Sequence, residues 1–134
     1  LKKREIVFWD ELREIELGPW EGRLYSDIKS ENSTAHDCFF YQPDKFYVEG
    51  AETFERLTDR AYSAIQKIAE NNHKKCIAVV SHGAFIKALL TRIEGKKLNQ
   101  IWEPPFMHNC AHNIINFNES FDGTITQYAD KSEW

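Results

Sequence analysis

The chain of 134 residues is 42% hydrophobic and 28% charged, a composition typical of a globular domain with one buried core. A formal net charge of -4 with no long basic stretch argues against a nucleic-acid partner. No apolar segment approaches about 18 residues, so a membrane span is not expected. The three cysteines cannot all pair and lack metal-type spacing, which favours a reducing, cytoplasmic location.

The chain opens with a predicted strand and a turn region that contains two carboxylates. Residues 5–9 are β-branched and aromatic, which favours a strand. Residues 10–22 follow as a turn region, in which Glu14 and Glu16 stand among apolar residues. A carboxyl group with apolar neighbours suits general acid chemistry, because its protonated form is favoured there. The alternative is that both carboxylates are solvated loop charges.

An aromatic segment follows. Residues 24–30 predict a short helix with Tyr25 and Ile28 facing inward, and residues 31–49 predict a long, irregular loop. Two interpretations of this loop stay open: a lid or substrate wall, and a satellite hydrophobic cluster that fixes the loop to the body. The aromatic residues of the loop are Phe39, Phe40, Tyr41, Phe46 and Tyr47.

The longest helical pattern begins after Thr53, a candidate N-cap, and ends near Asn71. Apolar residues recur there at intervals of three and four residues, which indicates an amphipathic helix. They are Phe54, Leu57, Ala61, Ile65 and Ile68. We interpret this helix as scaffold without a chemical role, except at its amino end.

A strand, a tight turn and a helix form the predicted centre of the fold. Residues 76–80 are a short apolar run typical of a buried strand, and residues 85–93 carry apolar side chains at helical spacing. His82 stands at the turn between them. In open α/β sheets ligands bind at such turns, where the positive end of a helix favours anions. His82 is therefore predicted to face a phosphate, or alternatively to cap the helix.

The last third of the chain predicts a helical turn and a β-hairpin, at residues 98–102, 112–117 and 124–128. His108 and His112 stand four residues apart, a spacing that gathers metal ligands on a helix. A strand between them separates the two rings, so no metal site is expected.

Three separated segments together resemble the histidine phosphatase superfamily, the phosphoglycerate-mutase-like group. They are residues 12–22 (LREIELGPWEG), 50–53 (GAET) and 80–83 (VSHG). A fourth, weaker match is Asn109, before the last hairpin. In that family a first histidine attacks the phosphorus, a second histidine and two arginines bind the phosphoryl oxygens, and a carboxylate protonates the leaving oxygen.

The resemblance implies a role for several residues of this chain. His82 corresponds to the second, phosphate-binding histidine, and Glu14 to the proton donor. Gly83 and Ala84 offer backbone amides to the phosphoryl group, and Asn109 lies where the family brings a loop to the pocket. The resemblance implies no metal and no cofactor.

The family's Arg-His-Gly motif, which carries the nucleophile, does not occur in this sequence. A second arginine-bearing family segment is also missing. The expectation is therefore that residues 1–134 form the C-terminal part of a single domain. The implied fold is a three-layer α/β/α arrangement with a mostly parallel sheet, its N-terminal elements absent. A sheet without a central strand exposes unpaired edges, which predicts a homo-oligomer or a strand swap.

The implied function is a phosphatase that hydrolyses small phosphate monoesters through a phosphohistidine, with the nucleophile outside this chain. Ile15 stands where the mutase branch generally carries an arginine, which favours a phosphatase over a mutase. The alternative is a catalytically inactive, truncated remnant that binds an anion or regulates. The expected partner is a small phosphorylated metabolite, with neither nucleic acid nor membrane.

Overall fold

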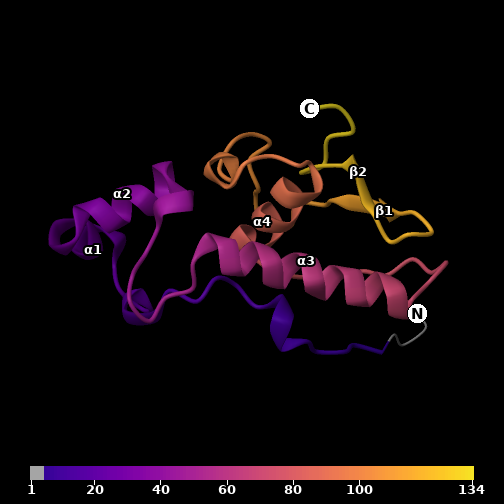
Figure 1. Ribbon diagram of the computed structural model, residues 1–134, viewed down its shortest axis with the longest axis horizontal. Coiled ribbons are helices and arrows are strands. Elements are labelled where there is room, and N and C mark those ends of the chain that lie inside the picture. Colours follow the sequence, from indigo (N-terminus) through magenta and orange to yellow (C-terminus); the bar gives the residue numbers. More distant parts are fainter. Residues whose placement is uncertain (1–4) are drawn as a thin grey trace.

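The computed structural model describes residues 5–134 (Figure 1). The order along the chain is helix α1, Tyr25–Glu31; α2, Ser33–Tyr41; α3, Phe54–Asn71; α4, Gly83–Ile93; and then strands β1, Ile114–Phe117, and β2, Gly123–Gln127. Short 3-10 turns occupy Asp10–Leu12, Gly18–Trp20, Pro43–Lys45 and Leu98–Gln100. Among residues 5–134, no helix combines the length and the apolar character needed to cross a membrane.

Helices α3 and α4 form the centre of the molecule. The hydroxyl of Thr53 accepts a hydrogen bond from the backbone N–H of Arg56 (3.3 Å), which confirms the predicted N-cap of α3. Leu57 and Ala61 are fully buried on its inner face, and Ala88 is fully buried on α4. The amphipathic patterns of both helices therefore predicted the core correctly.

The aromatic segment is more ordered than the sequence pattern predicted. Residues expected to be irregular include α2, which begins where the side chain of Asn32 accepts a hydrogen bond from the N–H of Ala35 (3.0 Å). Phe39 and Phe46 are buried in the main core, against Phe54. The prediction of a loop without secondary structure was wrong, and the interpretation as a hydrophobic cluster holds for these two rings.

The sheet is smaller than predicted. Within the described residues, the only sheet is the antiparallel pair β1 and β2, in which Phe117 lies opposite Gly123. This confirms the C-terminal hairpin, whereas the mostly parallel sheet is not present. Residues 5–9 and 76–80 form no strand, because a strand requires a neighbour for its N–H and C=O groups, and the described chain offers none to them.

Candidate functional site

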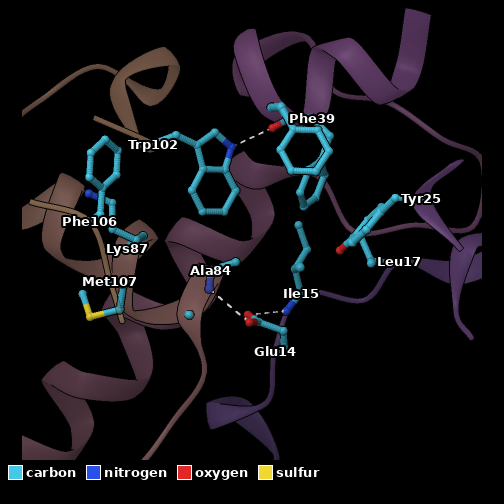
Figure 2. Close-up of a pocket in the computed structure, with 12 residues that line it drawn as sticks. Glu14, Ile15, Leu17, Tyr25, Phe39, Ala84, Lys87, Trp102, Phe106 and Met107 are labelled. Atoms are coloured by element: carbon cyan, nitrogen blue, oxygen red, sulfur yellow. Dashed lines mark hydrogen bonds between the residues drawn. The ribbon is translucent and has the colours of Figure 1, made fainter. Parts of the chain in front are cut away.

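The carboxylate of Glu14 lies at the amino end of α4. Its oxygens accept hydrogen bonds from the backbone N–H groups of Ala84 (3.0 Å) and Ile15 (3.0 Å) (Figure 2). They also accept one from the N–H of Phe85 (2.9 Å). The positive end of the helix dipole favours a negative charge at this point. Glu14 is thus fixed in position by a helix that begins about 70 residues later in the chain.

Glu14 performs the capping that the turn itself does not provide. His82 is the N-cap residue of α4, with extended backbone geometry, but its side chain makes no capping hydrogen bond. His82 therefore occupies the N-cap position, but its side chain does not cap the helix. The first amides of a helix have no partner inside the helix, and Glu14 satisfies two of them. An anion that binds to the amide of Ala84 has to compete with this carboxylate.

A cavity of about 370 Å³ opens beside the Glu14 carboxylate (Figure 2). Its polar side is formed by Glu14 and the first residues of α4, and the remainder is mainly apolar and aromatic. The residues of the apolar side are Ile15, Leu17, Tyr25, Phe39, Phe40, Trp102, Phe106 and Met107. Phe39 and Phe40 line this cavity, so the segment for which a lid or substrate wall was one of two interpretations borders a pocket.

Among residues 5–134, Lys87 is the one cationic side chain that lines the cavity, and it is only 4% exposed. Its Nζ donates to the carbonyl oxygens of Glu103 (2.6 Å) and Pro105 (3.2 Å) and to the hydroxyl of Tyr128 (2.7 Å). Burial lowers the pKa of Lys87 to about 8. These bonds tie α4 to the segment that supplies Phe106 to the cavity wall.

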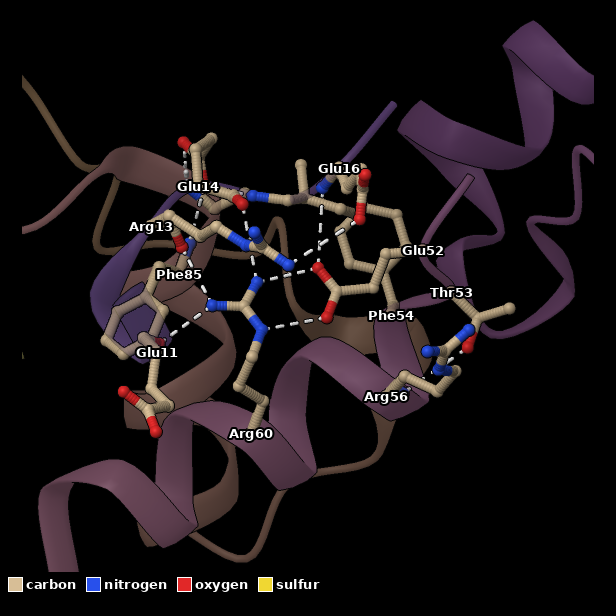
Figure 3. Close-up of polar contacts among 12 residues, drawn as sticks. Glu11, Arg13, Glu14, Glu16, Glu52, Thr53, Phe54, Arg56, Arg60 and Phe85 are labelled. Carbon is tan, nitrogen blue, oxygen red and sulfur yellow. Dashed lines mark hydrogen bonds and ion pairs between the residues drawn. The ribbon is translucent and has the colours of Figure 1, made fainter. Parts of the chain in front are cut away.

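A second polar cluster lies behind the segment that carries Glu14 (Figure 3). The guanidinium of Arg60, on α3, donates to both carboxylate oxygens of Glu52, at 2.9 and 2.6 Å. It also donates to the backbone carbonyl oxygens of Glu11 (2.8 Å), Arg13 (2.9 Å) and Glu14 (3.3 Å). The sequence pattern indicated a role for α3 only at its amino end, so this contact of Arg60 was not predicted.

The structure brings together only part of the predicted site. Glu14, Gly83 and Ala84 all line the cavity, whereas His82 and Asn109 are exposed and do not line it. The Nε2 atom of His108 lies 3.0 Å from a carboxylate oxygen of Asp130. No group of three or more residues able to hold a metal ion occurs within residues 5–134.

Of the two basic residues that the sequence analysis did not single out, one gave a weak signal in the sequence and the other gave none. Lys87 is a single charged residue between the apolar residues Ile86 and Ala88, and such a position on a buried helix face indicates a satisfied internal cation. Arg60 gave no comparable signal, because it stands on the charged side of the α3 pattern.

The fold and the site define a class of protein. The sequence profile described as the histidine phosphatase superfamily (branch 1) matches residues 1–130, and the chain belongs to this family. Phosphatases and a phosphoglycerate-mutase-like protein are among its curated relatives.

Three of these similar proteins are 27% to 36% identical to this chain over the aligned residues. The uncharacterized phosphatase PhoE of Bacillus subtilis is 36% identical over 100 residues, which are 75% of this chain and 50% of that protein. Phosphoglycerate mutase-like protein 4 of Arabidopsis thaliana is 27% identical over 133 residues, 97% of this chain and 55% of that protein. Bacillus stearothermophilus YhfR superposes with a TM-score of 0.87 at 28% identity, over 92% of this chain and 60% of the other. The chain thus spans about half the length of the curated relatives it matches.

Proposed function

We propose that this chain is the C-terminal part of a phosphatase that hydrolyses small phosphate monoesters through a phosphohistidine, with the nucleophilic histidine outside residues 1–134. The observation that carries the proposal is the position of Glu14. A carboxyl group that borders the cavity stands where the leaving oxygen of a substrate needs a proton.

The proposed reaction has two steps. First, a histidine nitrogen attacks the phosphorus, the ester P–O bond breaks, and the leaving oxygen takes a proton from Glu14. Second, water attacks the phosphohistidine and gives a proton back to the Glu14 carboxylate, which releases inorganic phosphate and frees the histidine. The products of the two steps together are the free alcohol and inorganic phosphate, and the whole reaction consumes one water molecule.

The exposed turn has the phosphate-binding role in this proposal. His82 and the amide of Gly83 contact the phosphoryl oxygens, and Asn109 approaches from the loop before β1. The amide of Ala84 is shared between the phosphoryl group and the Glu14 carboxylate. These donors stabilise the negative charge that develops on the phosphoryl oxygens. The aromatic side of the cavity holds the alcohol part of the substrate.

A second candidate function is an inactive remnant that binds an anion or regulates another protein. It is favoured by one observation of the sequence: residues 1–134 contain no Arg-His-Gly motif. Loss of a nucleophile lowers the turnover of a covalent mechanism by several orders of magnitude.

The experiment that separates these functions uses the polypeptide present in cells and an isotope-labelled phosphate donor. An enzyme gives an acid-labile label on a histidine, together with hydrolysis of phosphate monoesters. A cellular protein that takes up no label contradicts the enzyme and leaves the remnant.

Glu14 is tested in the same assay with a matched pair of variants. Glu14→Gln removes the proton donor and is expected to lower kcat by about 10² to 10⁴. Glu16→Gln changes an exposed carboxylate two residues away, in a weak ion pair with Arg13, and leaves kcat unchanged. Equal kcat values for the two variants exclude Glu14 as the proton donor.

A further inference from the structure

The guanidinium of Arg60 has every one of its donors in use. A guanidinium has five N–H groups, and Arg60 makes five hydrogen bonds, two to Glu52 and three to backbone carbonyl oxygens (Figure 3). The three carbonyl oxygens belong to residues 11, 13 and 14, all in the segment that carries the Glu14 side chain. Arg60 can therefore make all five hydrogen bonds only when the backbone of residues 11–14 follows this one path.

The charge of Arg60 is balanced by Glu52. The two side chains are 17% and 10% exposed, so the pair is largely removed from solvent. A buried ion pair contributes little net stability compared with apolar residues of the same size, and its geometry fixes the position of neighbouring groups. Glu52 adds to this geometry, because its backbone N–H donates to the carbonyl oxygen of Glu16 (2.6 Å).

Two helices thereby hold the segment that carries Glu14, one through its backbone and the other through a side chain. Its backbone carbonyls are bound by Arg60 on α3, and the carboxylate of Glu14 is bound by the first amides of α4. The ring of Phe85 lies 5.7 Å from the guanidinium carbon of Arg60 and joins the two attachments. Release of the backbone from α3 is therefore expected to loosen the contact of the carboxylate with α4.

We propose that Arg60, with Glu52 as its counter-ion, is the positioning residue for Glu14. It keeps the carboxylate in contact with the amides of Ala84 and Phe85. In that position the carboxyl group can give a proton to the leaving oxygen of a substrate. The proton transfer in this statement rests on the proposed function, whereas the positioning is a property of the chain alone. Arg60 itself touches neither the cavity nor the reacting atoms.

The test measures hydrogen exchange of individual amides in the 134-residue chain, by mass spectrometry with fragmentation. In Arg60→Met and Arg60→Lys, the amides of Ala84 and Phe85 are expected to exchange about tenfold faster, since loss of a helix cap has an effect of this order. Lysine keeps the charge, but with three N–H groups it cannot replace five bonds. The Lys variant also decides the question if the Met variant does not fold.

The matched control is Arg92→Met. Arg92, on α4, pairs with Asp59 on α3, and its guanidinium lies over the ring of Tyr62, so it also joins the two helices. It makes no contact with the segment that carries Glu14. Unchanged exchange at Ala84 and Phe85 is expected there. The proposal is overturned if the Arg60 variants leave these two amides unchanged, or if exchange rises equally along the whole of α4.

Activity of the nucleophile-bearing polypeptide supplies a readout that separates this proposal from the proposed function. Arg60→Lys is expected to lower kcat about tenfold for an alkyl phosphate and much less for an aryl phosphate, since a phenolate leaves with little help from an acid. Equal losses for both substrates contradict the positioning role. If Glu14→Gln is fully active, Glu14 is not the proton donor, while the exchange result still decides whether Arg60 positions its carboxylate.

Discussion

Phe8 and Phe54 have the same side chain in opposite surroundings. Phe54, in the first turn of α3, is fully buried, and its ring lies 5.1 Å from that of Phe39. Phe8 is 90% exposed, in the extended residues 5–9. The same contrast separates α4 from residues 76–80 directly before it, where Val80 is 89% exposed. An apolar side chain creates a preference for burial, and a neighbouring element has to satisfy it.

The largest effect is expected where this contrast is tested directly. Phe54→Ala removes a buried ring from contact with other aromatic rings and is expected to lower the free energy of unfolding by about 3 to 5 kcal/mol. Phe8→Ala changes a ring already in water, and a change below about 0.5 kcal/mol is expected. Urea unfolding of both variants measures the difference. Similar losses for the two variants would mean that residues 5–9 are packed in solution.

A smaller effect is expected at the contact between the Glu14 segment and the loop before α3. Gly18 has φ of +54°, and a Cβ atom there would overlap the carbonyl oxygen of Gly50. Because backbone has to move, Gly18→Ala is expected to lower the free energy of unfolding by about 2 to 3 kcal/mol.

Gly22 is the matched control for this contact. Its φ is +71°, but a Cβ atom would meet nothing within 4 Å. Gly22→Ala therefore carries only the conformational cost, about 1 kcal/mol. Thermal unfolding of the two variants isolates the close approach to Gly50, and equal losses would show that the loop before α3 yields to the added methyl group.

Features that depend on neighbouring residues were predictable from the sequence. The apolar spacing of α3 and α4, the Thr53 cap and the C-terminal hairpin are set by residues a few positions apart. Helix α2 was missed because its cap, Asn32, stands in a polar stretch without apolar periodicity. Residues 76–80 have a strand pattern, but a ladder depends on a distant partner that the pattern does not contain.

The same rule applies to the site. Glu14 and the turn at His82 were found as separate motifs, and their contact across 70 residues of sequence followed only from the resemblance. The role of Arg60 was not predictable, since its acceptors are backbone carbonyls 46 to 49 residues away, and every residue type carries such a group. Its bond to Glu52, eight residues earlier, was likewise hidden among many exposed charges.

The buried side chain of Lys87 is expected to make the free energy of unfolding depend on pH. Its pKa falls from the ordinary 10.5 to about 8 in the folded chain. Between these values the unfolded chain binds more protons, so the free energy of unfolding rises with pH. Burial raises the pKa of Tyr128, which reverses the trend above about pH 10, the ordinary range of a tyrosine.

The rise between pH 8 and 10 is expected to reach about 2 kcal/mol. Urea unfolding at four pH values in this window measures the slope, and Lys87→Met is expected to remove it. A wild-type chain whose stability is flat or falls over this window would show that water reaches the ammonium group.

The smallest effect on stability, together with a large effect on self-association, is expected at the exposed residues 76–80. Residues 76–80 present apolar side chains on backbone that no described segment pairs with, an arrangement that recruits a strand from another molecule. The wild-type chain is therefore expected to self-associate in sedimentation experiments. Val80→Lys is expected to weaken this association while changing the stability of each chain by less than about 0.5 kcal/mol.

Tyr41→Lys separates this edge from general surface hydrophobicity. Tyr41 is also exposed, at 74%, but it is the last residue of α2, and its helical backbone does not have the extended shape of a strand. Only a segment with free N–H and C=O groups can extend a sheet, so Tyr41→Lys is expected to leave self-association unchanged. If both lysine variants reduce association equally, the contact is made by apolar patches without strand pairing. If the wild-type chain is a compact monomer, the backbone N–H and C=O groups of residues 76–80 have partners within the chain, and the expected strand pairing between molecules is excluded.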